Sequence, residues 1–160
     1  MRLLILPTWQ TIIVDIVVWW IIHTLAVRIA LHRPDDAFAT DRGLYNVHPM
    51  EARLYEKVFM IKRWKHYLPD AGKRQRMGFS KARLTSKDKP YLERFVAETR
   101  RAEFAHYLQM LPAPLFFLFN EPWVGGFMIV YAVVVNVPCI ITQRYNRPKL
   151  LRLLSNVKNS

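Results

Sequence analysis

The chain has 160 residues, with 24 Lys+Arg against 12 Asp+Glu, a formal net charge of +12, and 52% hydrophobic residues. This length predicts a single domain over residues 1–160, and the apolar content excludes intrinsic disorder. The one cysteine excludes a disulfide framework. The charges are segregated from long apolar segments, so we expect membrane lipid, and no nucleic acid, as the partner of the basic regions.

The first apolar segment covers residues 9–31 and carries few strongly polar side chains, such as Asp15 and His23. A helix of about 20 apolar residues crosses a hydrocarbon core of about 30 Å. Its apolar part is longer than the roughly 7–15 residues of a signal-peptide core, and no small-residue cleavage motif follows. We therefore predict a retained membrane span near residues 9–31.

Residues 32–103 hold most of the basic side chains and form a predicted cytoplasmic or interfacial region. Within them Leu54, Val58, Ile61 and Leu68 recur at helical spacing, opposite a basic face. This pattern predicts an amphipathic helix lying in the headgroup plane. A helix packed within a soluble subdomain is the alternative.

The second half of the chain predicts two further spans. A helix over residues 91–111 starts charged and becomes apolar, giving a span near 104–119 that Pro112 and Pro114 interrupt. After a turn at residues 120–122, residues 123–142 carry no charge and predict a span near 123–143. Because basic segments stay cytoplasmic, the residues indicate an all-α, multi-pass integral membrane protein with about three transmembrane helices and a cytoplasmic active face.

The first candidate catalytic cluster combines His66 with Asp70, flanked by Arg63 and Lys65. On a continuous helix these two residues share one face, so the carboxylate can orient the ring while the other ring nitrogen accepts a hydroxyl proton. His66 is the first candidate for a general base, with Asp70 orienting it. The alternative is that His66 is one more cation of an interfacial helix.

A second cluster contains Glu98, Arg101, Glu103 and His106. Residues three apart meet on a helix, which predicts the pairs Glu98–Arg101 and Glu103–His106. His106 with Glu103 is the alternative base, and an ion pair that sets helix register is the structural alternative. A di-metal site of the helical-bundle type needs two Glu-x-x-His copies. Only one is present, so we predict no metal.

The last candidates lie in and after the third predicted span. Asn136 precedes a proline and predicts an amide that faces the protein interior. Arginine forks bind phosphates and carboxylates, so we expect the following block to bind an anionic acyl donor, with headgroup anchoring as the alternative. The block comprises Gln143, Arg144, Tyr145, Asn146 and Arg147.

Three segments together resemble the glycosyl-4,4'-diaponeurosporenoate acyltransferases: MIKRWKHYLPD (residues 60–70), ETRRAEFAH (98–106) and NVPCIITQRYNRP (136–148). The resemblance runs from about residue 30 to 154. It implies the last step of staphyloxanthin-type carotenoid biosynthesis in a bacterial cell membrane. In that step a fatty acyl group is transferred to a sugar hydroxyl of a glycosylated carotenoid acid, or of a related glycolipid.

The sequence thus predicts a membrane acyltransferase with a histidine general base at the cytoplasmic interface. We expect acyl-CoA or acyl carrier protein as co-substrate, no further cofactor, and a possible homo-oligomer. Arg101, Arg144 and Arg147 are expected to bind donor phosphates or the developing oxyanion. The other hypotheses are a non-enzymatic membrane scaffold that binds anionic lipid, and a membrane methyltransferase.

Overall fold

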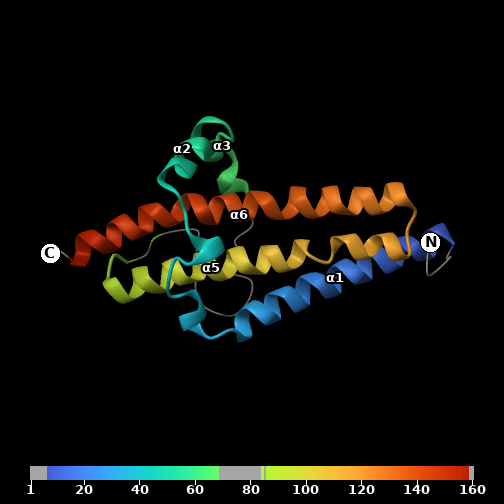
Figure 1. Cartoon of the computed structure of the whole chain (residues 1–160), viewed down its shortest axis with the longest axis horizontal. Coiled ribbons are helices and arrows are strands. Elements are labelled where there is room, and N and C mark those ends of the chain that lie inside the picture. The colour runs from blue at the N-terminus through green and yellow to red at the C-terminus, as the bar shows by residue number, and fades with distance from the viewer. Residues whose placement is uncertain (1–6, 69–83, 85, 159–160) are drawn as a thin grey trace. The chain divides into compact units, whose positions relative to one another are not determined.

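The computed structural model describes residues 7–68, 84 and 86–158, and over these residues the chain is helical without any β-strand (Figure 1). The α-helices are α1 (Thr8–His32), α2 (Pro49–Lys57), α3 (Ile61–Trp64), α5 (Lys89–Met110) and α6 (Pro122–Lys158). Short 3-10 helices are η1 (Asp35–Phe38), η2 (Gly43–Tyr45), η3 (Lys65–Tyr67) and η4 (Ala113–Leu118). The predicted all-α class is confirmed.

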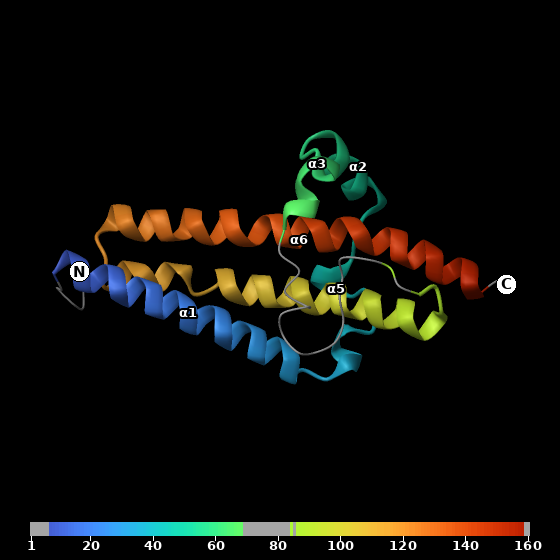
Figure 2. The same cartoon turned by 180° about the vertical axis from the view of Figure 1, so that it is seen from behind.

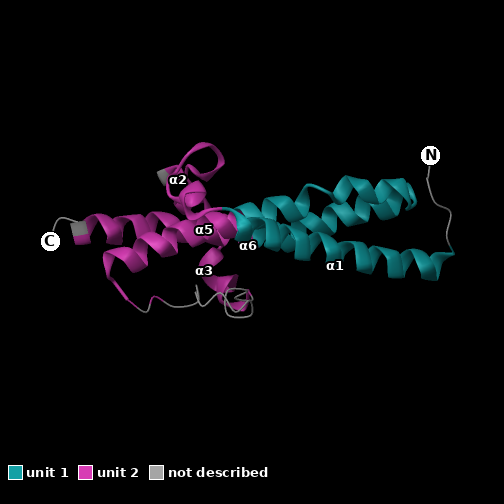
Figure 3. Ribbon diagram, turned by 90° about the horizontal axis from the view of Figure 1, so that it is seen from below, with its two compact units in different colours: residues 1–33, 104–138 teal, residues 34–103, 139–160 magenta. Residues whose placement is uncertain are grey.

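The chain forms two compact units (Figure 3). Unit 1 comprises residues 1–33 and 104–138, and unit 2 comprises residues 34–103 and 139–160. Both α5 and α6 contribute residues to each unit, because the boundaries fall inside these helices. A single domain over residues 1–160 stays a prediction.

Unit 1 has a small aromatic core. Trp19, Ala113, Phe116 and Ala132 are buried together. The Trp19 and Phe116 rings stack with centroids 4.8 Å apart, and the Trp19 indole N–H donates to the sulfur of Met128 at 3.2 Å. The core residues of α1 are therefore a minority of that helix, and large apolar side chains of the helix remain on its outside.

Two helices are long and apolar enough to cross a bilayer: α1 over Thr8–His32 and α6 over Pro122–Val157. Within their most apolar windows, 17% and 28% of the residues are buried. A core helix of a soluble protein would be mostly buried instead. The exposed side chains include Ile12, Ile13, Ile16 and Trp20 on α1, and Trp123, Phe127, Val130 and Val134 on α6.

The predicted span near 104–119 differs from the other two. Helix α5 ends at Met110, and the chain continues as the 3-10 helix η4. Pro112 has no backbone N–H and its ring clashes with the preceding turn, so the α-helix ends before it. This segment does not form one long apolar helix, and a third crossing stays a prediction.

Unit 2 combines an apolar cluster with a polar interior. Leu92, Phe95, Val96 and Leu150 are buried together, between the first part of α5 and the last part of α6. Beyond this cluster unit 2 also buries apolar side chains such as Phe38 and Ile61. It further buries a set of charged or polar side chains, namely Thr99, Arg100, Arg101, Glu103, Tyr145 and Arg147. Such groups are buried only when they are paired, so their contacts define the candidate site.

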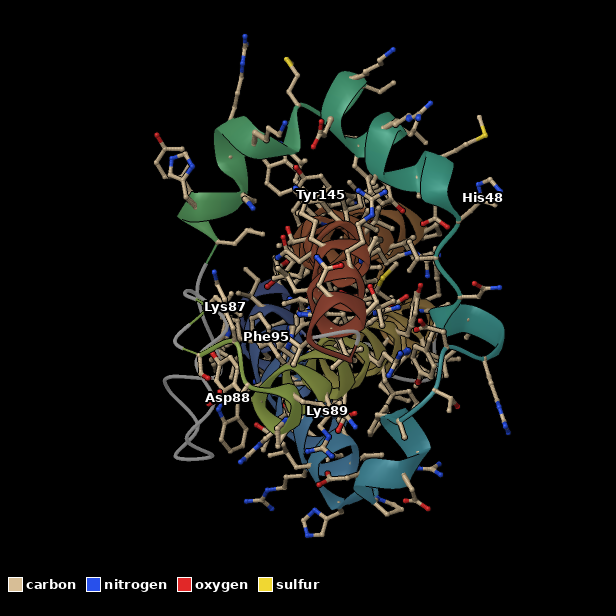
Figure 4. All side chains as sticks on the ribbon, turned by 90° about the vertical axis from the view of Figure 1, so that its left-hand side faces the viewer. His48, Lys87, Asp88, Lys89, Phe95 and Tyr145 are labelled. Carbon is tan, nitrogen blue, oxygen red and sulfur yellow. The ribbon has the colours of Figure 1, made fainter. Side chains whose placement is uncertain are left out.

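The periodic segment 54–68 is not one amphipathic helix. It is divided into α2, α3 and η3, with Met60 in the left-handed region at φ 45° before α3. Both views place α2 and α3 beside α6 (Figure 1, Figure 2). His48 caps the start of α2 (Figure 4), accepting from the Met50 N–H at 3.2 Å. The predicted interfacial role of this segment stays a prediction.

Candidate active site

The centre of unit 2 is the carboxylate of Glu103 on α5, which is fully buried. It accepts from two arginines that lie one helical turn apart on α6. Arg144 Nη1 donates to Glu103 Oε1 at 2.8 Å, and Arg147 Nη2 donates to Oε2. One buried carboxylate therefore bridges both arginines and ties α5 to α6.

Every N–H of the Arg144 guanidinium group donates a hydrogen bond within the protein. Its Nε and Nη2 donate to the two Glu51 oxygens on α2, each at 2.8 Å, as a bidentate fork. Its Nη1 also reaches the Leu44 carbonyl at 2.7 Å, and Nη2 reaches the Asn46 carbonyl at 2.9 Å. These contacts and the bond to Glu103 account for all five N–H donors of an arginine.

Arg147 is buried as completely as Glu103. Its Nε donates to Thr99 Oγ1 at 3.0 Å, and its Nη1 donates to the Tyr45 carbonyl at 2.7 Å. The guanidinium groups of Arg144 and Arg147 thus hold unit 2 together. Their predicted role in binding the acyl donor stays a prediction.

The ion pair with Arg144 changes the acidity of its partners on α2. The Arg144 hydrogen bond lowers the pKa of Glu51 to about 2, against the smaller opposing effect of burial. Burial, followed by the hydrogen bond that the hydroxyl donates to Glu51 at 2.8 Å, raises the pKa of Tyr55 to about 12. Near neutral pH, Glu51 is therefore ionised and Tyr55 protonated.

Two further arginines of α5 are paired within unit 2. Arg101 contacts Glu98 at 3.0 Å, as the spacing predicted, and also contacts Asp35. Arg100 donates to Asp41 at 2.7 Å and to the Phe38 carbonyl at 2.6 Å. Asp35 and Asp41, near the start of unit 2, therefore pair with these two arginines across 66 and 59 residues of sequence.

Tyr145 and Asn146 of the predicted α6 block lie next to a basic surface. The Tyr145 hydroxyl donates to Glu56, and the ammonium groups of Lys65 and Lys149 lie 5.2 Å and 3.7 Å from the centre of its ring. Lys65 also reaches Asn146 Oδ1 at 3.5 Å. Figure 4 labels Tyr145 on α6. Gln143 is half-buried on the same helix.

We call this basic surface the lysine surface and define it by Lys62, Arg63, Lys65 and Lys149. Lys62 and Lys149 both contact Glu56, at 3.0 Å and 3.8 Å. The side chains of Lys62 and Lys149 remain largely exposed, and so does Arg63. Two of these four cations share the carboxylate of Glu56, so the surface keeps a net positive charge.

His106 belongs to unit 1, where it meets Asn136. The ring Nδ1 lies 2.8 Å from Asn136 Oδ1, and the Asn136 amide nitrogen donates to the Ala132 carbonyl at 2.9 Å. The second bond fixes the orientation of the amide, so its oxygen faces the ring and Nδ1 is the donor. In the neutral ring the lone pair is then on Nε2, the nitrogen that can accept a proton.

His66 occupies a different setting. It lies in η3, its side chain is exposed, and its ring centroid is 4.0 Å from that of Tyr67. Asp70, its predicted partner, lies outside the described residues. Within the described parts of the chain, no group of three or more His, Cys, Asp or Glu side chains has the arrangement of a metal site.

A sequence model of the glycosyl-4,4'-diaponeurosporenoate acyltransferases matches residues 41–156 of this chain. The chain belongs to this family. A protein of that name from Staphylococcus aureus (strain MRSA252) is 32% identical over 144 residues, which are 88% of this chain and 86% of the relative. One from Staphylococcus haemolyticus (strain JCSC1435) is 31% identical over 134 residues, 82% and 78% of the two chains.

Membership of the acyltransferase family makes this chain an enzyme and decides between acyl transfer and the scaffold and methyltransferase hypotheses. The matched range includes Glu51, Glu103, His106 and the two central arginines, whereas α1 lies before it. No solved structure matches the fold.

Several residues of the site were not foreseen from the sequence. Glu51, Asp35 and Asp41 lie far along the chain from the arginines they contact, and Glu56 lies far from Lys149. Local spacing shows only pairs within one helix. For Glu51 a signal was available: it stands three residues after the helix-capping His48 and contacts its backbone N–H at 3.1 Å.

Proposed function

We propose that this acyltransferase works in a bacterial cell membrane and transfers a fatty acyl group to a sugar hydroxyl of a glycosylated carotenoid acid or a related glycolipid. The names of its relatives support the acceptor class. A lipid acceptor also suits a chain whose α1 and α6 leave apolar faces uncovered. The acyl chain and the acceptor would then both dissolve in the phase that surrounds the enzyme.

The basic residues of unit 2 support a cytoplasmic active face. Lysines and arginines are retained on the cytoplasmic side of a membrane, and the lysine surface carries four of them. Fatty acyl thioesters are made in the cytosol, so a donor-binding face belongs there. We infer a multi-pass arrangement with unit 2 at the cytoplasmic interface.

For the general base, the geometry favours His106 over His66. His106 is half-buried and its ring is oriented by Asn136, in the way that a third group orients the base in a catalytic triad. His66 is exposed, and its ring lies beside that of Tyr67. His106 therefore takes the role of base with Asn136 as its positioning residue, and His66 is the alternative.

The proposed reaction balances with one base. His106 Nε2 accepts the hydroxyl proton while the sugar oxygen bonds to the thioester carbonyl carbon. The resulting tetrahedral intermediate collapses, the carbon–sulfur bond breaks, and the imidazolium returns its proton to the leaving thiolate. The products are an ester and a free thiol, so the acyl thioester serves as co-substrate.

Within unit 2, the lysine surface is the part that we propose to attract the acyl donor. Arg144 has no N–H left for a ligand, whereas Lys62, Arg63 and Lys149 are exposed. Ammonium and guanidinium groups attract the phosphates of acyl-CoA, and equally the acidic face of acyl carrier protein. Glu103, Arg144 and Arg147 then act as positioning residues that hold α2, α5 and α6 in place.

The experiment compares His106→Ala with His66→Ala in purified enzyme in micelles, with labelled acyl-CoA and a lipid glucoside as substrates. Loss of a general base lowers turnover about 10²- to 10⁴-fold, so we expect this loss for His106→Ala and less than about threefold for His66→Ala. The size-exclusion profile of both variants should match that of the unaltered enzyme.

The opposite result, a large loss for His66→Ala and near-normal turnover for His106→Ala, would reassign the base to His66. Normal turnover in both variants would exclude histidine general-base catalysis. The unaltered enzyme could also fail to acylate the glucoside and acylate another lipid hydroxyl instead. That result would overturn the proposed acceptor class but not the assignment of the general base.

A further inference from the structure

Unit 1 contains a cavity of about 630 Å³ that the proposed reaction does not use. It lies between α1 and α6, and its walls are mainly apolar and aromatic. They include Ile12, Ile16, Trp19 and Trp20 from α1, with Trp123 and Phe127 from α6. This volume falls within the range of about 300 to 1,000 Å³ that small-molecule sites occupy.

One wall of the cavity is polar. Asp15 and Asn120 both line it, and both are buried, with Asn120 2% exposed. The Asn120 amide nitrogen donates to Asp15 Oδ1 at 2.7 Å. Among the described residues, Asn120 Oδ1 is buried without a hydrogen-bond partner.

The polar wall therefore has more acceptors than donors. The Asp15 carboxyl oxygens and the Asn120 amide oxygen are acceptors, and one N–H of the Asn120 amide donates between the two side chains. A buried acceptor without a partner makes an unfavourable contribution to the free energy of the fold. A ligand that brings a hydrogen-bond donor to this wall would recover that free energy.

From this geometry we propose that the cavity binds a neutral lipid alcohol, with its apolar body against the tryptophans and its hydroxyl donating to the Asp15–Asn120 pair. A neutral hydroxyl supplies a donor without bringing a charge among the apolar walls, whereas a carboxylate or ammonium head would bring one. This site is separate from the proposed acyl transfer and does not depend on it.

The test uses all-trans-retinol and its methyl ether as probes of nearly equal shape, because only the alcohol donates a hydrogen bond. Retinol absorbs where tryptophan emits, so energy transfer from Trp19, Trp20 and Trp123 reports binding to the full-length chain in micelles. We expect saturable retinol binding about tenfold tighter than that of the ether, a factor corresponding to about 1.4 kcal/mol.

Two variants of α6 locate the site. Val124 lines the cavity, so Val124→Phe should weaken retinol binding at least about tenfold by filling it. Val134 is 63% exposed on the same helix, so Val134→Phe is the matched control and should change binding less than about twofold. The comparison of retinol with its methyl ether uses the unaltered chain, so its result does not depend on whether either variant folds.

Three results would overturn the proposal. Binding that does not saturate would mean partition into the micelle alone. Equal affinity for alcohol and ether would remove the donor role of the ligand and leave a plain apolar groove. Unchanged binding in Val124→Phe would place the probe elsewhere.

Discussion

At the scale of single residues, the contact between His106 and Asn136 determines which nitrogen of the imidazole ring carries the proton. The ring alone does not specify which nitrogen carries the proton. The Asn136 amide specifies it, because its own nitrogen is held by the Ala132 carbonyl and only its oxygen can face the ring. The sequence had placed both residues near the interior, but it paired His106 with Glu103.

This arrangement makes Asn136 a positioning residue for the proposed base. We expect Asn136→Ala to lower kcat about 10- to 100-fold, with KM nearly unchanged, because the acceptor that fixes the ring is lost. Steady-state kinetics with labelled acyl-CoA would measure it. Asn136→Asp keeps an acceptor oxygen and should recover much of the rate. Equal kcat in Asn136→Ala and the unaltered enzyme would contradict the role.

Arg147 illustrates why an arginine cannot be exchanged for a lysine in a buried network. Its planar head reaches Thr99, the Tyr45 carbonyl and Glu103 at once. A lysine has one nitrogen on a flexible stem and cannot span these three acceptors. The replacement would leave buried polar groups without partners.

We therefore expect Arg147→Lys to lower the free energy of unfolding by about 2–4 kcal/mol, as for other broken buried pairs. Denaturant titration in mixed micelles would measure it. Arg152→Lys, at an exposed position of the same helix, is the control and should change stability by less than about 0.5 kcal/mol. A similar loss in both variants would argue against a special role of the network.

At the scale of elements, a bidentate ion pair between Glu51 and Arg144 holds α2 to α6, beside the contacts that Glu56 makes with Tyr145 and Lys149. The pairing lowers the pKa of Glu51 from 4.5 to about 2. A carboxyl whose pKa is lower in the folded state stabilises the fold fully above its unfolded pKa. This stabilisation is lost as the pH falls from about 4.5 towards 2.

Stability should thus fall by about 2–3 kcal/mol over this pH window on account of Glu51, since one pKa unit corresponds to about 1.4 kcal/mol. Unfolding curves at several pH values between 2 and 6 would show it. Glu51→Gln should be less stable at pH 6 and lose less between pH 4.5 and 2. Glu93→Gln, an exposed site on α5, should keep the full slope; an unchanged slope in Glu51→Gln would refute the assignment.

Helix boundaries were predicted well where a proline or a composition change marks them. Helix α5 was expected over residues 91–111 and runs Lys89–Met110. Helix α6 begins at Pro122, the last residue of the predicted turn, and continues to Lys158, past the end of the span predicted near 123–143. The segment 54–68 was predicted wrongly as one helix, since the break at Met60 has no proline or glycine to announce it. Its periodic apolar residues are divided between α2, α3 and η3.

At the scale of the whole molecule, the distribution of polar and apolar side chains differs between the two units. Unit 1 buries a few aromatic residues and leaves many large apolar side chains outside, whereas unit 2 buries arginines with carboxylates. Hydrocarbon around unit 1 and water or headgroups around unit 2 would satisfy both surfaces.

A charge on the outside of α1 tests this assignment. Val17 is exposed near the middle of the helix, and a lysine there costs about 2.5–3.5 kcal/mol in the membrane centre. We expect Val17→Lys to reduce the carbonate-resistant membrane fraction severalfold. Leu44→Lys, at an exposed position of unit 2, should not change it. Equal fractions for both variants would show that this face of α1 does not contact lipid.

The sequence by itself determined the helical class, the apolar segments, the segregation of charge and the family, because these depend on local composition and on the order of residues along the chain. Only the tertiary structure decided which charged and polar side chains contact one another. Glu103 between Arg144 and Arg147, Glu51 with Arg144, and Asn120 with Asp15 join residues up to 105 positions apart. Helical spacing reaches only the next turn, so partners brought together by packing are not readable from it.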